Sequence, residues 1–146
     1  MEGTQVITVV IPGDPVPKGR PRAALVSGRA RMYTPAKTAS YESRVALFAQ
    51  MAARGAGLQE PLDEALSVSI EAVLPIPASW SRRRQESAAA GVTRPTGRPD
   101  VDNVAKSVTD GCNGILWRDD SRIVDLTVRK VYGLEPMVRM VVREAT

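Results

Sequence analysis

The feature that most constrains the fold of this chain is an apolar periodicity between Val101 and Ile115. At about 100° per residue, one side of a helix through this segment collects apolar or small side chains. They are Val101, Val104, Ala105, Val108, Cys112 and Ile115. The opposite side carries Asp102, Asn103, Lys106, Ser107, Asp110 and Asn113. Because Asn113-Gly114 predicts a helix end, we expect an amphipathic helix that turns its polar side toward solvent.

Strand-like runs make up much of the remaining chain. Runs rich in valine, isoleucine and leucine, bounded by proline or glycine, predict strands at 5–11, 66–74, 123–132 and 137–143. Two short runs around Ser27-Gly28 predict a hairpin that ends near Tyr33.

A second helix is expected from Thr34, as its cap, to Gly55, with Pro35 in the first turn. Its apolar stripe indicates a structural role. The predicted fold class is α/β (α+β), with a mixed sheet of about four strands and two main helices. We expect one compact domain over residues 1–146.

Two basic segments stand out: an arm at 13–33 and an arginine-rich loop at 80–99. Five basic residues face one acid between Asp14 and Arg31, and five arginines face one acid between Arg82 and Arg98. Each of these two stretches carries +4, so the remainder of a chain of net charge +4 carries −4. We expect an exposed, proline-punctuated arm and a loop that is partly mobile without ligand. This uneven charge indicates an anionic partner.

The composition excludes several kinds of catalytic site. The chain has no histidine and one cysteine, which excludes imidazole bases, Ser-His triads and an ordinary zinc site. Chemistry must come from carboxylates, lysine, hydroxyls and a hard metal ion. Aromatic residues, at 4%, argue against base-stacking platforms. Cys112 has no disulfide partner, and no signal peptide or apolar span is recognisable, so we expect the cytoplasm and no membrane partner.

Four carboxylates flank the first helix described above. Asp100 and Asp102 lie where a loop enters that helix, and Asp119 and Asp120 lie where a loop enters the next strand. We expect folding to bring both pairs to one edge of the sheet. Magnesium binds a few carboxylate oxygens, keeps several waters and accepts substrate phosphate. Lys106, one turn beyond Asp102, would add positive charge at the phosphate.

Each acid also has a structural interpretation. Asp100 is an ordinary N-cap candidate, and Asp102 with Lys106 is a common i,i+4 ion pair. Asp119 and Asp120 are typical of a turn, and arginine runs are often solvated surface. The combination of these features favours a functional site, since caps and turns do not explain four acids gathered in a chain that also carries two basic segments and is otherwise acidic. A divalent ion that bridges the acids to a phosphate backbone does explain it.

Several motifs now fit a known family. They are Asp100-Val-Asp102-Asn103 with Lys106, then Gly114, Trp117 and Asp119-Asp120-Ser121, and the opening that runs from Ile11 to Arg22. Together they resemble the RusA family of Holliday-junction resolvases, which phages and prophages often carry. The resemblance implies that the metal ligands are Asp100, Asp102 and Asp120. It also implies that Lys106 is needed for cleavage, with Asp119 as a possible further ligand or support.

The same resemblance implies the cofactor, substrate and assembly. The cofactor would be Mg²⁺, with Mn²⁺ as a possible substitute. The protein would be a homodimeric crossover junction endodeoxyribonuclease of the bacterial cytoplasm or nucleoid, possibly phage-encoded. It would resolve four-way branched DNA by paired, symmetric phosphodiester hydrolysis in recombination and repair. The expected DNA contacts are Lys18, Arg20, Arg22 and Arg98. A proline-stiffened arm loses less entropy when it orders on phosphates.

Three alternatives stay open at this point. The first is a broader branched-DNA nuclease that acts on flaps or forks in phage replication or packaging. The second is a non-catalytic DNA-binding protein whose acids only cap and turn. The third is a metal-dependent enzyme for small phosphorylated substrates, which would not need so extended a set of arginines.

Overall fold

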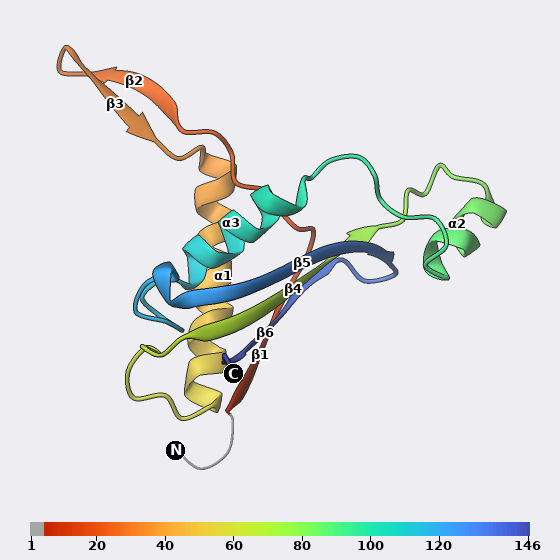
Figure 1. Ribbon diagram of the computed structural model, residues 1–146. Coiled ribbons are helices and arrows are strands. Elements are labelled where there is room, and N and C mark those ends of the chain that lie inside the picture. The colour runs from red at the N-terminus through yellow and green to blue at the C-terminus, as the bar shows by residue number, and fades with distance from the viewer. Residues whose placement is uncertain (1–4) are drawn as a thin grey trace.

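The computed structural model describes residues 5–146 as a mixed sheet covered on one face by two helices (Figure 1). The strands of the sheet are β1 (Val6–Pro12), β4 (Leu66–Pro75), β5 (Ile123–Gly133) and β6 (Met137–Glu144). Their order is β1-β6-β4-β5. Strands β4 and β5 are parallel, and the other pairs are antiparallel. The predicted α+β class with a mixed four-stranded sheet is confirmed.

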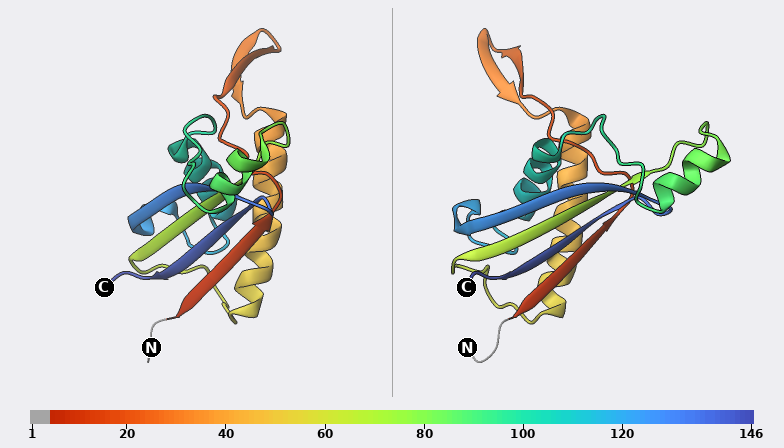
Figure 2. Two further views of the ribbon diagram at one scale, coloured as in Figure 1. Left: turned by 90° about the vertical axis from the view of Figure 1, so that its right-hand side faces the viewer. Right: turned by 45° about the vertical axis from the view of Figure 1, so that its right-hand side comes forward.

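The hydrophobic core lies between the sheet and the helices α1 (Ala36–Gly55) and α3 (Val101–Cys112). Strand β1 alternates exposed and buried residues, as a strand with one covered face should. Helix α1 packs over β1, and α3 packs over the β5 side of the sheet. In the part of the chain that the structure describes, the other face of the sheet carries no helix (Figure 2).

The predicted apolar side of α3 is largely confirmed. Val104, Ala105, Val108 and Cys112 are buried, whereas Val101 at the helix start is 38% exposed. The helix ends at Cys112, so Ile115 lies beyond it and is partly buried against the core.

The start of α1 differs from the prediction. Pro35, and not Thr34, holds the N-cap position, and no side chain caps the helix. Thr34 precedes a proline, whose ring disfavours helical geometry in the residue before it. The carbonyl of Pro35 accepts the first helical hydrogen bond, from the N–H of Ala39 at 3.0 Å. The predicted end at Gly55 is confirmed.

The arginine-rich segment 80–99 was expected to lack regular structure, and this was wrong. It contains α2 (Arg82–Ala89), whose N-cap Ser81 accepts a hydrogen bond from the N–H of Arg84 at 3.2 Å. The Arg84 guanidinium lies 3.7 Å from the centre of the Trp80 ring, and Trp80 meets Tyr132 of β5 edge-on. A capped helix and an aromatic contact therefore order a segment whose charge alone indicated a loop.

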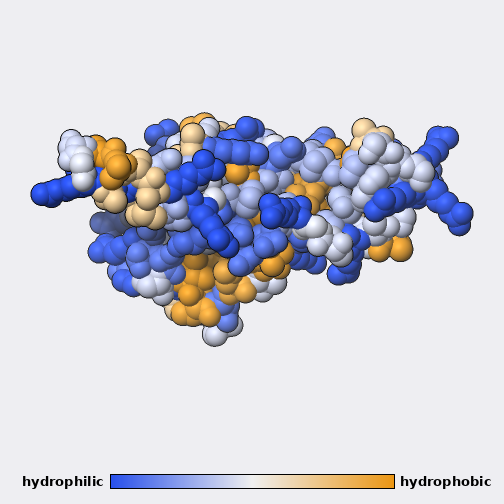
Figure 3. Space-filling model, turned by 90° about the horizontal axis from the view of Figure 1, so that it is seen from above, coloured by the Kyte–Doolittle hydropathy of each residue, from blue (hydrophilic) through white to orange (hydrophobic). Residues whose placement is uncertain are grey.

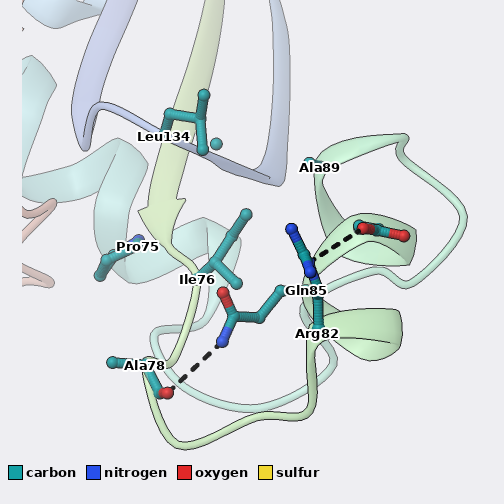
Figure 4. Close-up of a pocket in the computed structure, with 9 residues that line it drawn as sticks. Pro75, Ile76, Ala78, Arg82, Gln85, Ala89 and Leu134 are labelled. Atoms are coloured by element: carbon teal, nitrogen blue, oxygen red, sulfur yellow. Dashed lines mark hydrogen bonds and ion pairs between the residues drawn. The ribbon is translucent and has the colours of Figure 1, made fainter.

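A hollow of about 450 Å³ lies between α2 and the ends of β4 and β5 (Figure 4). Gln85 reaches across it to donate a hydrogen bond to the carbonyl of Ala78 at 3.4 Å. None of the four candidate carboxylates lines this hollow. It is therefore separate from the predicted site.

The predicted hairpin is confirmed as β2 (Arg22–Val26) and β3 (Arg29–Tyr33), a two-stranded ribbon that projects from the body (Figures 1 and 2). Ser27 and Gly28, at its tip, both have positive φ, at 52° and 76°. Two-residue turns that match strand twist need this geometry, which glycine adopts without strain. Among residues 5–146, no helix has the length and apolar character needed to cross a bilayer.

Candidate active site

The first two candidate acids lie at the start of α3. Asp100 holds the N-cap position, where its carbonyl accepts a hydrogen bond from the N–H of Val104 at 3.1 Å. Its carboxylate makes no capping hydrogen bond, so the expected structural role of that side chain is not seen. Asp102 follows in the first turn, and both residues are exposed. The positive end of the helix dipole favours anionic groups here.

Lys106 connects this helix to the second acidic pair. Its Nζ lies 3.0 Å from Oδ1 of Asp110 and 3.9 Å from Oδ2 of Asp120. The i,i+4 partner of Lys106 is therefore Asp110, and the Asp102–Lys106 pair considered from the sequence is not formed. The contact with Asp120 shows that folding does bring the segment after α3 back against the helix.

Asp119 and Asp120 make different contacts. Asp119 is the N-cap of the short helix η1 (Asp120–Arg122), and its Oδ2 accepts a hydrogen bond from the N–H of Ser121 at 3.1 Å. Hydrogen bonds from Ser121 hold the pKa of the Asp119 carboxyl below its usual range. Asp119 thus fits the turn interpretation, while Asp120 faces Lys106 and α3.

The candidate acids do not by themselves form a complete metal-binding site. Within residues 5–146, no three histidine, cysteine, aspartate or glutamate side chains lie close enough to hold a metal ion together. Magnesium does not require such a set of side chains, because one or two carboxylates, waters and substrate phosphates complete its shell. Asp100, whose carboxylate makes no capping hydrogen bond, and Asp102 are suited to supply oxygen ligands to an ion of this kind.

The basic arm is not the free segment that its prolines suggested. Its first part lies along the polar side of α3, where the N–H of Lys18 donates to the carbonyl of Asn103 at 2.8 Å. The hydroxyl of Ser107 donates to the carbonyl of Val16 at 2.6 Å. Ser107 was expected on the solvent side of the helix, but the arm covers it completely.

Lys18 was expected to contact DNA, which stays a prediction, but its ammonium group is already paired with two acids. Its Nζ lies 2.9 Å from Oε1 of Glu42 on α1 and 3.0 Å from Oδ2 of Asp110 on α3. Partial burial alone would lower the pKa of Lys18, but hydrogen bonds to these two acids outweigh burial and raise it. Lys18 therefore ties the arm to both helices. Arg20 and Arg22, further along, are exposed.

Two grooves border the start of α3. One, of about 470 Å³, brings the arm next to the first acid. It is lined by Pro17, Lys18, Arg20, Arg98, Pro99, Asp100 and Asn103. The other, of about 330 Å³, lies between α3 and β5 and includes Asp102 and Lys106. Three of the predicted DNA contacts, Lys18, Arg20 and Arg98, thus share a groove with Asp100.

Lys130 is a residue of this region that sequence patterns did not reveal. From β5, its Nζ donates to the carbonyls of Gly97 and Pro99, the latter at 3.0 Å. It holds the segment that leads into Asp100. Its only signal in the sequence was a lysine in a strand that also carries Asp125 and Arg129, which does not specify a partner.

An α+β domain that presents exposed acids, a lysine and a groove lined by two arginines has the parts of a phosphodiester-cutting site. The comparisons agree: the model of the family described as Endodeoxyribonuclease RusA matches residues 12–143. The chain belongs to this family of endodeoxyribonucleases, and the resemblance inferred from the motifs is confirmed. It is also 36% identical over 140 residues to an uncharacterized protein, YqaN, of Bacillus subtilis (strain 168). That alignment covers 96% of this chain and 97% of the relative.

Proposed function

We propose that this endodeoxyribonuclease is magnesium-dependent and resolves four-way DNA junctions by paired, symmetric hydrolysis. The observation that carries the proposal is the approach of Lys106 to Asp120, which joins both acidic segments beside the two grooves. Family membership supports the class of reaction and substrate.

The metal would be held by Asp100, Asp102 and Asp120, with Mn²⁺ as a possible substitute for Mg²⁺; because these three side chains do not converge in the structure, Asp120 would have to move toward the ion to join the other two. When bound, such an ion lowers the pKa of its water and stabilises charge on the scissile phosphate. The carboxylates of Asp100 and Asp102 supply oxygen ligands at a helix start. Asp119 supports the site by capping η1, whose first residue is Asp120.

Lys106 has two roles in this scheme. Without DNA, it balances the charge of Asp110 and Asp120, which lie on either side of its ammonium group. With DNA in the groove that it shares with Asp102, its ammonium group would lie near the cleaved phosphate and stabilise the leaving oxygen.

DNA would be held chiefly by exposed arginines, because the ammonium group of Lys18 is already paired. Arg20 and Arg98 line the Asp100 groove, and Arg22 begins the ribbon. These contacts are electrostatic, so binding should weaken steeply as salt rises. A homodimer is proposed because two symmetric cuts need two sites. We propose a cytoplasmic location, where the DNA of a bacterium or its phage would be the substrate.

The test is to incubate the protein with a labelled four-way junction, a flap and a linear duplex, with and without magnesium. Asp102→Asn is the key variant, and Asp125→Asn is the matched control, since Asp125 is an exposed acid on β5 that lines neither groove. Symmetric junction cuts that need magnesium and disappear only in Asp102→Asn support the proposal. Equal cutting of flaps would instead identify a broader branched-DNA nuclease. Binding without cleavage under magnesium or manganese would overturn the nuclease proposal.

A further inference from the structure

The β2–β3 ribbon has two chemically different faces. Its register pairs Arg22 with Tyr33, Ala23 with Met32, Ala24 with Arg31, Leu25 with Ala30, and Val26 with Arg29. Since paired residues share a face and successive residues alternate, all three arginines fall on one face. The other face consists of Ala23, Leu25, Ala30 and Met32 and is apolar throughout. We call these the arginine face and the apolar face.

The apolar face is uncovered. Leu25 is 80% exposed and Met32 is 67% exposed, although both are large hydrophobic side chains. Figure 3 shows apolar atoms beside hydrophilic ones on this ribbon, at the left end of the molecule. Two strands alone do not make a stable sheet, and a contiguous exposed apolar surface usually marks a binding site. The ribbon therefore lacks a covering partner in the protein alone.

Charge identifies the kind of partner. Residues 15–41 contain no acid at all. Their basic residues are Lys18, Arg20, Arg22, Arg29, Arg31 and Lys37. A second copy of the ribbon would bring like charges together, whereas a polyanion would be attracted. The chemistry favours nucleic acid over self-association.

The ribbon is also anchored beside the candidate active site. Gly19, just before it, donates its N–H to the buried Thr38 hydroxyl of α1 at 2.9 Å. An added Cβ on Gly19 would lie 3.0 Å from Pro35 and from Thr38, so the chain passes close to the helix. Arg20 lines the groove that contains Asp100. DNA in that groove would therefore meet the base of the ribbon.

We propose that this ribbon recognises the branch point of the DNA substrate. The arginine face lies on phosphates of one arm, and Leu25 and Met32 cover the face of a base pair left unstacked at the branch. In a linear duplex every internal base pair is stacked on both sides, so an apolar surface gains contact there only by unstacking a step. A two-stranded ribbon has the dimensions to enter a groove. This inference rests on the proposed function and assigns its selectivity to a segment separate from the acids.

The experiment measures binding, in the Asp102→Asn background, to a four-way junction and to a linear duplex of equal length. The test variant combines Leu25→Ser and Met32→Ser, and the control is Leu134→Ser. Leu134 is 88% exposed and lies in the β5–β6 turn, outside the grooves. We expect the test variant to bind the junction at least about tenfold more weakly and the duplex within about twofold, because both side chains lose buried area only at a branch. The control should match the parent on both DNAs.

A second variant, Arg29→Ala with Arg31→Ala, separates the contribution of charge to DNA binding from the contribution of the apolar face. It should weaken binding to both DNAs and reduce the slope of log affinity against log salt by about 2. Unchanged junction affinity in the Leu25 and Met32 variant would overturn the inference while leaving junction cleavage by the native protein intact. A change in oligomeric state in that variant, measured by light scattering, would overturn it in favour of a second copy as the partner. A native protein that neither binds nor cuts branched DNA would overturn the proposed function and this inference with it.

Discussion

The packing of α3 on α1 at Gly111 leads to a prediction about stability. A Cβ added at Gly111 would lie 2.7 Å from both Cβ and Cγ1 of Val45, and 3.0 Å from the carbonyl oxygen of Glu42. Alanine favours a helix over glycine by about 1 kcal/mol. Overpacking costs about 1–3 kcal/mol, and Val45 is fully buried with a branched side chain that has little freedom to move. Because Val45 cannot move aside, the upper part of that range applies, about 2–3 kcal/mol. Subtracting the helix preference of about 1 kcal/mol leaves an expected loss of about 1–2 kcal/mol in the free energy of unfolding for Gly111→Ala.

The assay is urea unfolding of the variant, a control and a rescue pair. The control is Gly55→Ala at the end of α1, where an added Cβ has no neighbour within 4 Å, and it should be neutral or stabilising. The rescue adds Val45→Ala, which removes the Cγ1 contact of that side chain and leaves only its Cβ contact, so it relieves part of the overpacking. The double variant should therefore be more stable than the two single losses predict, by at least about 0.5 kcal/mol. Strict additivity, or a Gly111→Ala protein as stable as the native one, would refute the close-packing argument.

Three further predictions concern charge and the site. Lys18→Met leaves Glu42 and Asp110 without their shared cation and should lower the free energy of unfolding by about 1–3 kcal/mol at neutral pH, measured by denaturant titration. Burial raises the pKa of Cys112 from 9.0 to about 12, so between those values the unfolded chain loses a proton that the folded chain keeps. Stability should therefore fall as pH rises through that window, and less steeply in Cys112→Ala; equal slopes would contradict this. Asp119→Asn retains a capping side chain and should keep junction cleavage within about tenfold, whereas Asp120→Asn should abolish it; equal effects would show that the two acids do not differ in role.

Periodicity and turn chemistry were sufficient to predict most of the fold. The apolar runs bounded by proline or glycine predicted all four strands of the sheet, and the 3.6-residue spacing predicted α3 with its buried Cys112. These patterns are local consequences of which face meets the core. Helix α2 was missed because its arginines were taken as evidence of a loop. Ser81 before them was the capping signal that identifies a helix start.

The candidate site was less accessible to prediction, because its contacts join distant parts of the chain. The family resemblance implied that Asp100, Asp102 and Asp120 bind the metal together, and that role stays a prediction. The partners of Lys18 and Lys130 depend on how the arm and β5 cross α3, which no local pattern encodes. Lys18 was placed among the DNA contacts because charge in a sequence does not show which charges are already paired.

The pairing of Lys18 with two acids determines where unbalanced positive charge remains on the protein. Glu42 and Asp110 share the ammonium group of Lys18, so the part of the arm that covers α3 is balanced internally. The unbalanced charge begins at Arg20 and continues along the ribbon, away from the acids. Among the proposed metal ligands, Asp120 is approached by Lys106 at 3.9 Å, whereas Asp100 and Asp102 form no ion pair within residues 5–146 and so have no cationic side chain that would compete with a metal ion. An enzyme that must bind both a cation and a polyanion needs this separation, because arginines placed directly against the acids would neutralise both.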